Sequence, residues 1–263
     1  MISPFSFMKI KTILITHLHG DHVFGLVGLI QTMDMSGRVE PLNIYGPPGL
    51  SELIGSVRTS TENEGIKYDL KVIEVTGGES FTEGIFSIDV YPTVHTIPSV
   101  GYTVREPDTP GTLNVSKARS LGINGSGLGK LKNGMKVGNV RPEDVMGPRI
   151  PGIKVSYTGD TAPSDVVCEY SRDADVIIHE STYMSSEEEL SAKHLHSTSK
   201  QAAETALKSN ARFLILTHIS NRYDDREALR LEACEVFPES YVADDFDLFR
   251  VSAKKMVREN TVI

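Results

Sequence analysis

The stretch that decides the fold is Thr16-His17-Leu18-His19-Gly20-Asp21-His22, which gathers three imidazoles and a carboxylate within six residues. It follows an apolar segment, residues 12–16, that is typical of a buried strand. His17 and His19 are two residues apart, so on an extended backbone their side chains leave on the same side. The glycine permits a turn, and the apolar residues that follow, 22–33, predict a helix.

Such a cluster offers more ligands than one tetrahedral zinc ion takes from a single loop. It therefore indicates two metal ions in a shared cavity, an arrangement that suits in-line displacement at phosphorus or hydrolysis of an acyl group. The alternative is a His-rich surface turn that binds metal by accident. The predicted strand, turn and helix around the cluster favour the built site.

Composition restricts the class of protein. The chain has 263 residues, 39% hydrophobic and 24% charged, which fits one large soluble domain or two small ones. We expect no membrane span and no secretory signal, because no apolar run is long enough and the first residues lack a basic-then-apolar layout. Two cysteines, Cys168 and Cys234, are too few for a disulfide framework, so we expect reduced thiols in a cytoplasmic protein. The net charge of −8 argues against a generally nucleic-acid-binding surface.

Short apolar segments alternate with amphipathic ones, which predicts sheets covered by helices on their outer faces. Helices are expected at 22–33, 49–62, 198–209 and 225–236, and Thr198 with Gln201 forms a capping-box pair at the start of the third. Strands are expected at 12–16, 42–46, 70–75, 85–94, 100–105, 153–158, 175–179, 213–218, 240–243 and 247–252.

The segment 112–150 differs from the rest of the chain. It holds seven glycines and no strong hydrophobic periodicity, and its seven basic residues against two acidic ones give a net charge of +5. A segment of this length without regular structure is usually functional or disordered, and a mobile loop with solvated lysines is the alternative.

Further histidines and a carboxylate fall at the ends of predicted strands. His95, His179 and His218 each close a strand, and Asp160 follows Gly159 at the end of another. Rigid strands that give way to loops are where a preorganised site places its ligands. A carboxylate also suits the position between two ions, because each of its oxygens can bind one.

Together these residues resemble the metallo-β-lactamase superfamily, and within it the ribonuclease Z family of tRNA 3′-processing endonucleases. The superfamily motif is His17-Leu18-His19-Gly20-Asp21-His22. The narrower resemblance rests on four pieces: His95-Thr96-Ile97-Pro98-Ser99-Val100-Gly101-Tyr102, His179-Glu180-Ser181-Thr182-Tyr183, His196-Ser197-Thr198 and His218-Ile219-Ser220-Asn221-Arg222-Tyr223. It implies an α/β fold in which two mixed sheets form an αββα sandwich, with a protruding basic, glycine-rich arm.

The resemblance assigns a role to each matching residue. One zinc would bind His17, His19 and His95, the second Asp21, His22 and His218, and Asp160 would bridge them; Mn²⁺ or another divalent ion is an alternative metal. Asp21 would also orient the attacking water or take its proton. Glu180 and His196 would form the pair that protonates the departing 3′ oxygen. The alternative for Glu180 is a structural role as acceptor of a backbone amide. For His179 we favour structural support, and for His194 a surface position.

The resemblance also implies the substrate and the domain organisation. Residues 1–263 would form one domain, with 112–150 inserted as an arm that grips the body of precursor tRNA through Lys130 and Lys132. Arg222 is expected to bind substrate as well. A homodimer, in which one subunit's arm serves its partner's site, is a further expectation from the family.

The chain departs from the family at its start. A typical member has about 40 further residues there, with a first strand, a Gly-Thr-Gly turn and a Phe-Asp-x-Gly-Glu segment, so we expect an N-terminally truncated fold with an exposed sheet edge.

Two other functions stay open, since a fold does not fix a reaction. One is a phosphodiesterase or thioesterase for small substrates, and the other is an inactive, truncated RNA-binding module. The basic segment and the Glu180–His196 pair favour RNA, because a thiolate leaving group needs little protonation.

Overall fold

The computed structural model describes residues 6–60, 65–252 and 255–259. The chain divides into two compact units, one made of residues 1–105 with 153–263 and the other of Glu106–Gly152. We describe each by itself.

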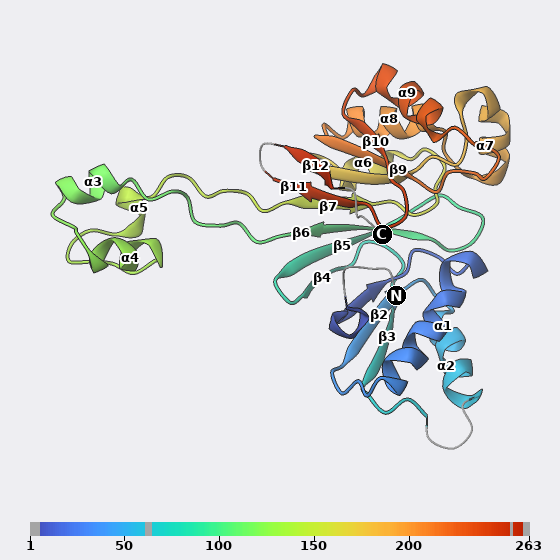
Figure 1. Cartoon of the computed structure of the whole chain (residues 1–263), viewed down its shortest axis with the longest axis horizontal. Helices are drawn as coiled ribbons and strands as arrows, with labels where there is room; N and C mark the ends of the chain where they lie inside the picture. The colour runs from blue at the N-terminus through green and yellow to red at the C-terminus, as the bar shows by residue number, and fades with distance from the viewer. Residues whose placement is uncertain (1–5, 61–64, 253–254, 260–263) are drawn as a thin grey trace. The chain divides into compact units, whose positions relative to one another are not determined.

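The first unit has two main sheets and a separate two-stranded hairpin, described below (Figure 1). The smaller has the order β1-β2-β3, and its strands Thr12–Leu14, Leu42–Gly46 and Leu70–Glu74 run parallel. The larger has the order β10-β9-β8-β7-β6-β5-β4, antiparallel from β4 to β7 and parallel from β7 to β10. Its strands are β4 Ser80–Glu83, β5 Phe86–Pro92, β6 Val100–Arg105, β7 Lys154–Tyr157, β8 Val176–Glu180, β9 Phe213–Thr217 and β10 Ser240–Val242. The expected mixed order is thus found in the larger sheet, whereas the smaller one is parallel throughout its described strands.

Alternating side chains of the small sheet serve two cores. Ile13 and Ile44 point to one side, where they pack with Val23 and Ile30 of α1 (Gly20–Met35) and with α2 (Leu50–Ser60). Leu14, one residue further along, points to the other side and joins the core that the two sheets share. This period of two is what a strand imposes, and it produces the predicted helix-on-sheet and sheet-on-sheet layers.

Helices also cover the large sheet. Ala202, Ala203 and Ala206 of α8 (Ser199–Lys208) pack on Ile177 and Leu214 together with α9 (Arg226–Val236). The predicted capping box of α8 is present. The opposite face of β8 and β9 packs against the hairpin β11–β12, Leu248–Val251 and Met256–Glu259.

Several short elements were not predicted. These are β4, β12, a 3-10 helix at Phe7–Lys9, another at Ser185–Glu187, α6 (Asp165–Tyr170) and α7 (Glu188–His194). The helices among them have at most seven residues and the strands four, lengths over which a periodic pattern is weak. None of the described helices is long and apolar enough to cross a membrane.

The second unit corrects the expectation that 112–150 lacks regular structure. It contains α3 (Val115–Ser120), α4 (Ser126–Lys132) and α5 (Pro142–Val145). Asn114 caps α3 by accepting a hydrogen bond from the Lys117 amide at 2.9 Å. The buried side chains of Ala118, Leu131, Val140 and Val145 form a small core. With one or two core residues per helix, no hydrophobic stripe is visible in the sequence.

Candidate metal centre

Loops at the ends of strands carry the predicted metal ligands. His17 and His19 lie between β1 and α1, and Asp21 and His22 occupy the first turn of α1. The remaining three lie in loops of the large sheet: His95 after β5, Asp160 after β7 and His218 directly after β9. Residues from both sheets therefore contribute to one cluster.

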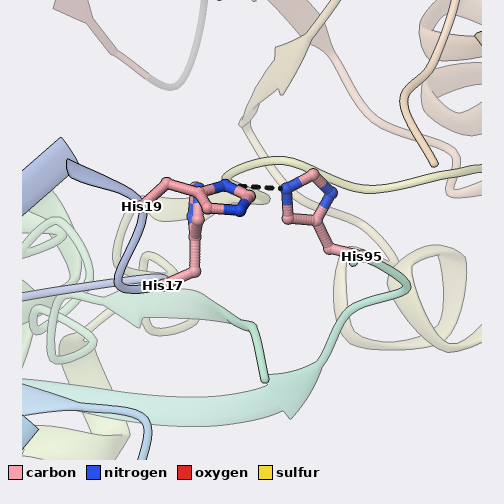
Figure 2. A group of neighbouring side chains, drawn as sticks. All are labelled: His17, His19 and His95. Carbon is pink, nitrogen blue, oxygen red and sulfur yellow. Dashed lines mark hydrogen bonds between the residues drawn. The ribbon is translucent and has the colours of Figure 1, made fainter. Parts of the chain in front are cut away.

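Three imidazoles form the first part of the cluster. The rings of His17, His19 and His95 turn toward one another (Figure 2), and His95 Nε2 lies 3.3 Å from His19 Nδ1. The centroid of the His17 ring lies 4.9 Å from that of the His19 ring and 5.0 Å from that of the His95 ring. One ligand nitrogen from each ring falls within 4.8 Å of the others, close enough for a single metal ion.

The Asp160 carboxylate lies close to histidines of both parts of the cluster. Its Oδ2 is 3.6 Å from Nε2 of both His17 and His22, and 3.4 Å from Nε2 of His218. The turn before it requires a glycine, because Gly159 has a φ of +60° and a Cβ there would meet the Thr16 side chain at 2.7 Å. Burial, and then the neighbouring Glu180 charge, raise the pKa of Asp160 to about 6.

The exposed end of the cluster consists of Asp21, His22 and His218, whose ligand atoms also lie within 4.8 Å of one another. Asp21 Oδ2 is 3.4 Å from His22 Nε2. The backbone of His218 adopts a φ of +54°, a left-handed conformation that a non-glycine residue holds only where its surroundings enforce it.

The protonation states suit a metal. Burial and the other imidazoles lower the pKa of His17 to about 3, and burial also lowers the pKa values of His95 and His218. These rings are therefore neutral near pH 7, as ligation requires. His17 Nε2 is buried without a hydrogen-bond partner among the described residues. A buried polar atom of that kind needs a partner, and a divalent ion among these nitrogen and oxygen donors supplies one.

Glu180 and His196 lie beside this cluster and touch each other. His196 Nδ1 donates to Glu180 Oε1 at 2.8 Å, and the His196 ring lies between those of His95 and His218, at 5.1 and 5.4 Å. Burial alone favours the neutral forms of both groups. The hydrogen bond and mutual charge nevertheless raise the pKa of His196, and they help to hold the pKa of Glu180 below its usual value. Each partner thus stabilises the charged form of the other.

Glu180 also has the structural role that the sequence left open. Besides His196, its carboxylate accepts hydrogen bonds from the amides of Thr161, Thr182 and Ser197, at 2.7, 3.3 and 3.1 Å. The Thr182 hydroxyl donates as well, at 2.7 Å. Sequence reasoning did not single out Thr182. The available signal was its position two residues after Glu180, which places both side chains on one side of an extended chain.

The other two histidines take no part in the cluster. His179 is buried, and its Nδ1 donates to the Glu180 carbonyl at 2.7 Å. His194 is exposed at the end of α7.

The predicted substrate-binding residues lie in different places. Lys130 and Lys132 are exposed in the last turn of α4, in the second unit. Arg222 pairs with Glu187 Oε1 at 2.5 Å and lies over the Tyr183 ring, 4.9 Å from its centroid. Their roles toward a substrate stay predictions.

Two cavities adjoin the cluster. One, of about 560 Å³, includes His95 and is otherwise lined mainly by uncharged residues such as Pro47, Pro98 and Ile97. The other, of about 440 Å³, includes His218 with Arg226 and Asp244. Each cavity thus includes one of the predicted metal ligands in its lining.

Comparison with known proteins identifies the family. Residues 8–108 match the model of the metallo-beta-lactamase superfamily, and residues 130–219 match that of the beta-lactamase superfamily domain. A ribonuclease Z of Methanothermobacter thermautotrophicus is 40% identical over 257 residues, which are 96% of this chain and 82% of that protein. The chain belongs to the ribonuclease Z family. A further relative is ribonuclease BN of Escherichia coli, 36% identical over 253 residues, with 92% of this chain and 82% of that protein covered.

Solved structures agree with this family. The structure of human tRNase Z, short form, superposes with a TM-score of 0.64 at 26% identity and covers 93% of this chain and 80% of that one. A metallo-beta-lactamase fold protein of Bacillus subtilis, YhfI, superposes with a TM-score of 0.63 at 20% identity, a likeness of fold alone. The predicted fold and family are thereby confirmed.

Proposed function

We propose that this chain is a metal-dependent endoribonuclease that removes the 3′ trailer of precursor tRNA, leaving a 3′-hydroxyl on the tRNA and a 5′-phosphate on the trailer. Membership of the ribonuclease Z family supports a hydrolytic nuclease. The single observation that carries the proposal is the Glu180–His196 pair beside the metal cluster. Hydrolysis of RNA expels an alkoxide, which needs a proton, and this pair holds one.

The cluster fits two divalent ions, and we propose zinc for both. His17, His19 and His95 would hold one, and Asp21, His22 and His218 the other, with Asp160 between them. Imidazole and carboxylate ligands suit zinc, while Mn²⁺ has the same ligand types available. When bound, such ions polarise a phosphodiester and lower the pKa of water, which supplies a nucleophile near neutral pH.

The protein's own residues position the reactants and move protons. Asp21 is exposed at the mouth of the cluster, where its carboxylate can orient the attacking water or take its proton. Glu180 holds the Nδ1 proton of His196, which fixes the ring and leaves Nε2 to donate to the departing 3′ oxygen. The Glu180 carboxylate raises the pKa of His196, which favours the form of the ring that can donate a proton.

We further propose that the segment 112–150 is an RNA-binding arm. The exposed Lys130 and Lys132 end α4 in a unit with its own small core, so they are presented by a folded element. Lysines near a glycine-rich backbone suit phosphate binding by counterion release.

Cys168 and Cys234 are free, in keeping with a cytoplasmic protein. The homodimer expected from the family is tested by light scattering of the purified chain.

Cleavage of a precursor tRNA with a 3′ trailer tests the function. We expect wild-type protein to release the trailer, and His22→Ala and Asp160→Ala to lose at least a hundredfold in rate. His194→Ala is the matched control, because its imidazole is exposed outside the cluster. Metal analysis should find about two ions per chain for an enzyme of this kind. Cleavage that survives both cluster substitutions would refute the mechanism, and a metal-free, inactive wild type would favour the RNA-binding module.

A further inference from the structure

The Thr182 hydroxyl lies between the metal cluster and the acid pair. It is 2.8 Å from His218 Nδ1 and 2.7 Å from Glu180 Oε2, and it lies 3.3 Å from His196 Nδ1. Thr182 is buried, so water does not compete freely for these bonds. A single hydroxyl thus contacts three of the residues to which the proposed mechanism assigns a role.

The backbone holds Thr182 in this position. Strands β8 and β9 pair in parallel up to Glu180 and Thr217. The segments that follow the two strands stay side by side. The Ser181 amide donates to the Thr217 carbonyl at 2.9 Å, and the Ser220 amide donates to the Thr182 carbonyl at 3.3 Å. Because β9 ends immediately before His218, this pairing places Thr182 against the His218 ring.

The hydrogens of this network can be assigned from the chemistry of each group. The Glu180 carboxylate accepts only, so the single hydroxyl proton of Thr182 goes to Glu180 Oε2. The hydroxyl oxygen then accepts, and its close partner at 2.8 Å is His218 Nδ1, which must therefore carry the proton. His196 Nδ1 gives its proton to Glu180 Oε1, the nearer acceptor. His218 thus donates to Thr182, and Thr182 donates to Glu180. His196 donates to the other oxygen of the same carboxylate.

We propose that Thr182 is a positioning residue whose hydroxyl fixes His218 for metal binding and, through the same oxygen, orients the Glu180–His196 pair. The second half rests on the proposed function; the first does not. With its proton held on Nδ1, His218 presents the lone pair of Nε2, which is the atom that faces Asp160 at 3.4 Å. Outer hydrogen-bond partners of this kind set the tautomer of ligating histidines.

Removal of the hydroxyl would leave both His218 and Glu180 without this partner. His218 Nδ1 would lose its acceptor, and the tautomer protonated on Nε2 could instead donate to Asp160 Oδ2. That tautomer has no lone pair for a metal on the cluster side. Glu180 would keep its amide donors and His196, but its Oε2 would lose the shortest bond that it accepts. We therefore expect one substitution to weaken metal affinity and proton donation together.

Metal binding gives the first test, and it needs no activity. Apoprotein of the wild type, Thr182→Val and Thr182→Ser is titrated with Zn²⁺ alone, and the weaker binding step is compared. Valine has nearly the shape of threonine without the hydroxyl, and we expect it to weaken that step about 10- to 100-fold. Serine keeps the hydroxyl and should stay within about threefold of the wild type. The control is Thr205→Val, which removes a buried hydroxyl that, among the described residues, bonds only to the Gln201 carbonyl in α8.

Catalysis gives the second test, at saturating metal. For Thr182→Val we expect a fall in kcat of at least tenfold on precursor tRNA at an unchanged KM, and a smaller fall on bis(p-nitrophenyl) phosphate, whose phenolate leaves without a proton. Circular dichroism of each variant establishes folding.

Unchanged zinc affinity in folded Thr182→Val overturns the first half of the proposal, and equal losses on both substrates overturn the second. If Thr182→Val does not fold, Thr182→Ser still decides, because a folded serine variant with a large loss in affinity would show that the hydroxyl is not the determinant. Should wild-type protein fail to cleave precursor tRNA, the proposed function fails while the zinc titration still tests His218.

Discussion

Replacement of His196 by alanine is the sharpest test of how the leaving group is protonated. The fold should survive, because Glu180 keeps its amide donors at Thr161, Thr182 and Ser197 and the Thr182 hydroxyl. The loss in stability is then that of one hydrogen bond to a charged group, about 1.5–3 kcal/mol. The loss in rate should be larger. A positioned general acid contributes about 10²- to 10⁴-fold, equivalent to about 3–5 kcal/mol in the activation barrier.

The assay compares two leaving groups. Single-turnover cleavage of precursor tRNA expels an alkoxide and should show the full loss for His196→Ala. Hydrolysis of bis(p-nitrophenyl) phosphate expels a stable phenolate and should fall by less than about tenfold, because little of its barrier depends on an acid. His194→Ala, two residues earlier and exposed, should match the wild type on both substrates. Equal losses on the two substrates for His196→Ala would refute the assignment of this ring as the acid.

Three further predictions concern pH and the second unit. The pKa of His196 is raised above its usual 6.5, so kcat on RNA should fall only as the pH rises through that raised value. Hydrolysis of bis(p-nitrophenyl) phosphate should show no such fall at alkaline pH. Lys130→Ala with Lys132→Ala should raise KM for precursor tRNA and weaken its salt dependence without altering aryl ester hydrolysis, and equal effects on both substrates would contradict an RNA-binding role. Leu131→Ala should cost about 2–5 kcal/mol within the small core, seen as faster hydrogen exchange confined to 106–152, whereas the half-exposed Leu121→Ala should leave exchange unchanged.

The position of the metal cluster could be predicted because its signal is local. His17 to His22 are six consecutive residues, and the sequence directly around them predicts the strand, the turn and the helix that hold them. The more distant His95, Asp160 and His218 were predictable for a different reason. Each lies at or shortly after the end of an apolar run, and the ends of neighbouring strands meet at one edge of a sheet. The structure brings all of them together, as the resemblance implied.

The second unit shows where local signals fail. Its helices are four to seven residues long, and the core that they share is made of side chains far apart in sequence. The segment is rich in glycine and basic residues and shows no strong hydrophobic periodicity, so it resembled an unstructured loop. Leu131 is buried only because α3, α4 and α5 meet around it.

By itself, then, the sequence determined that the site binds divalent metal ions, because imidazoles and carboxylates clustered at strand ends are ligands of such ions. Tertiary structure decided how those groups are protonated and connected. The pKa of His17 falls because the fold buries it among other imidazoles, and the pKa of His196 rises because the fold sets it against Glu180. Thr182 meets the His218 ring only when β8 pairs with β9. Hydrogen bonds and desolvation depend on distances of a few ångströms between segments far apart in the chain, and folding alone fixes those distances.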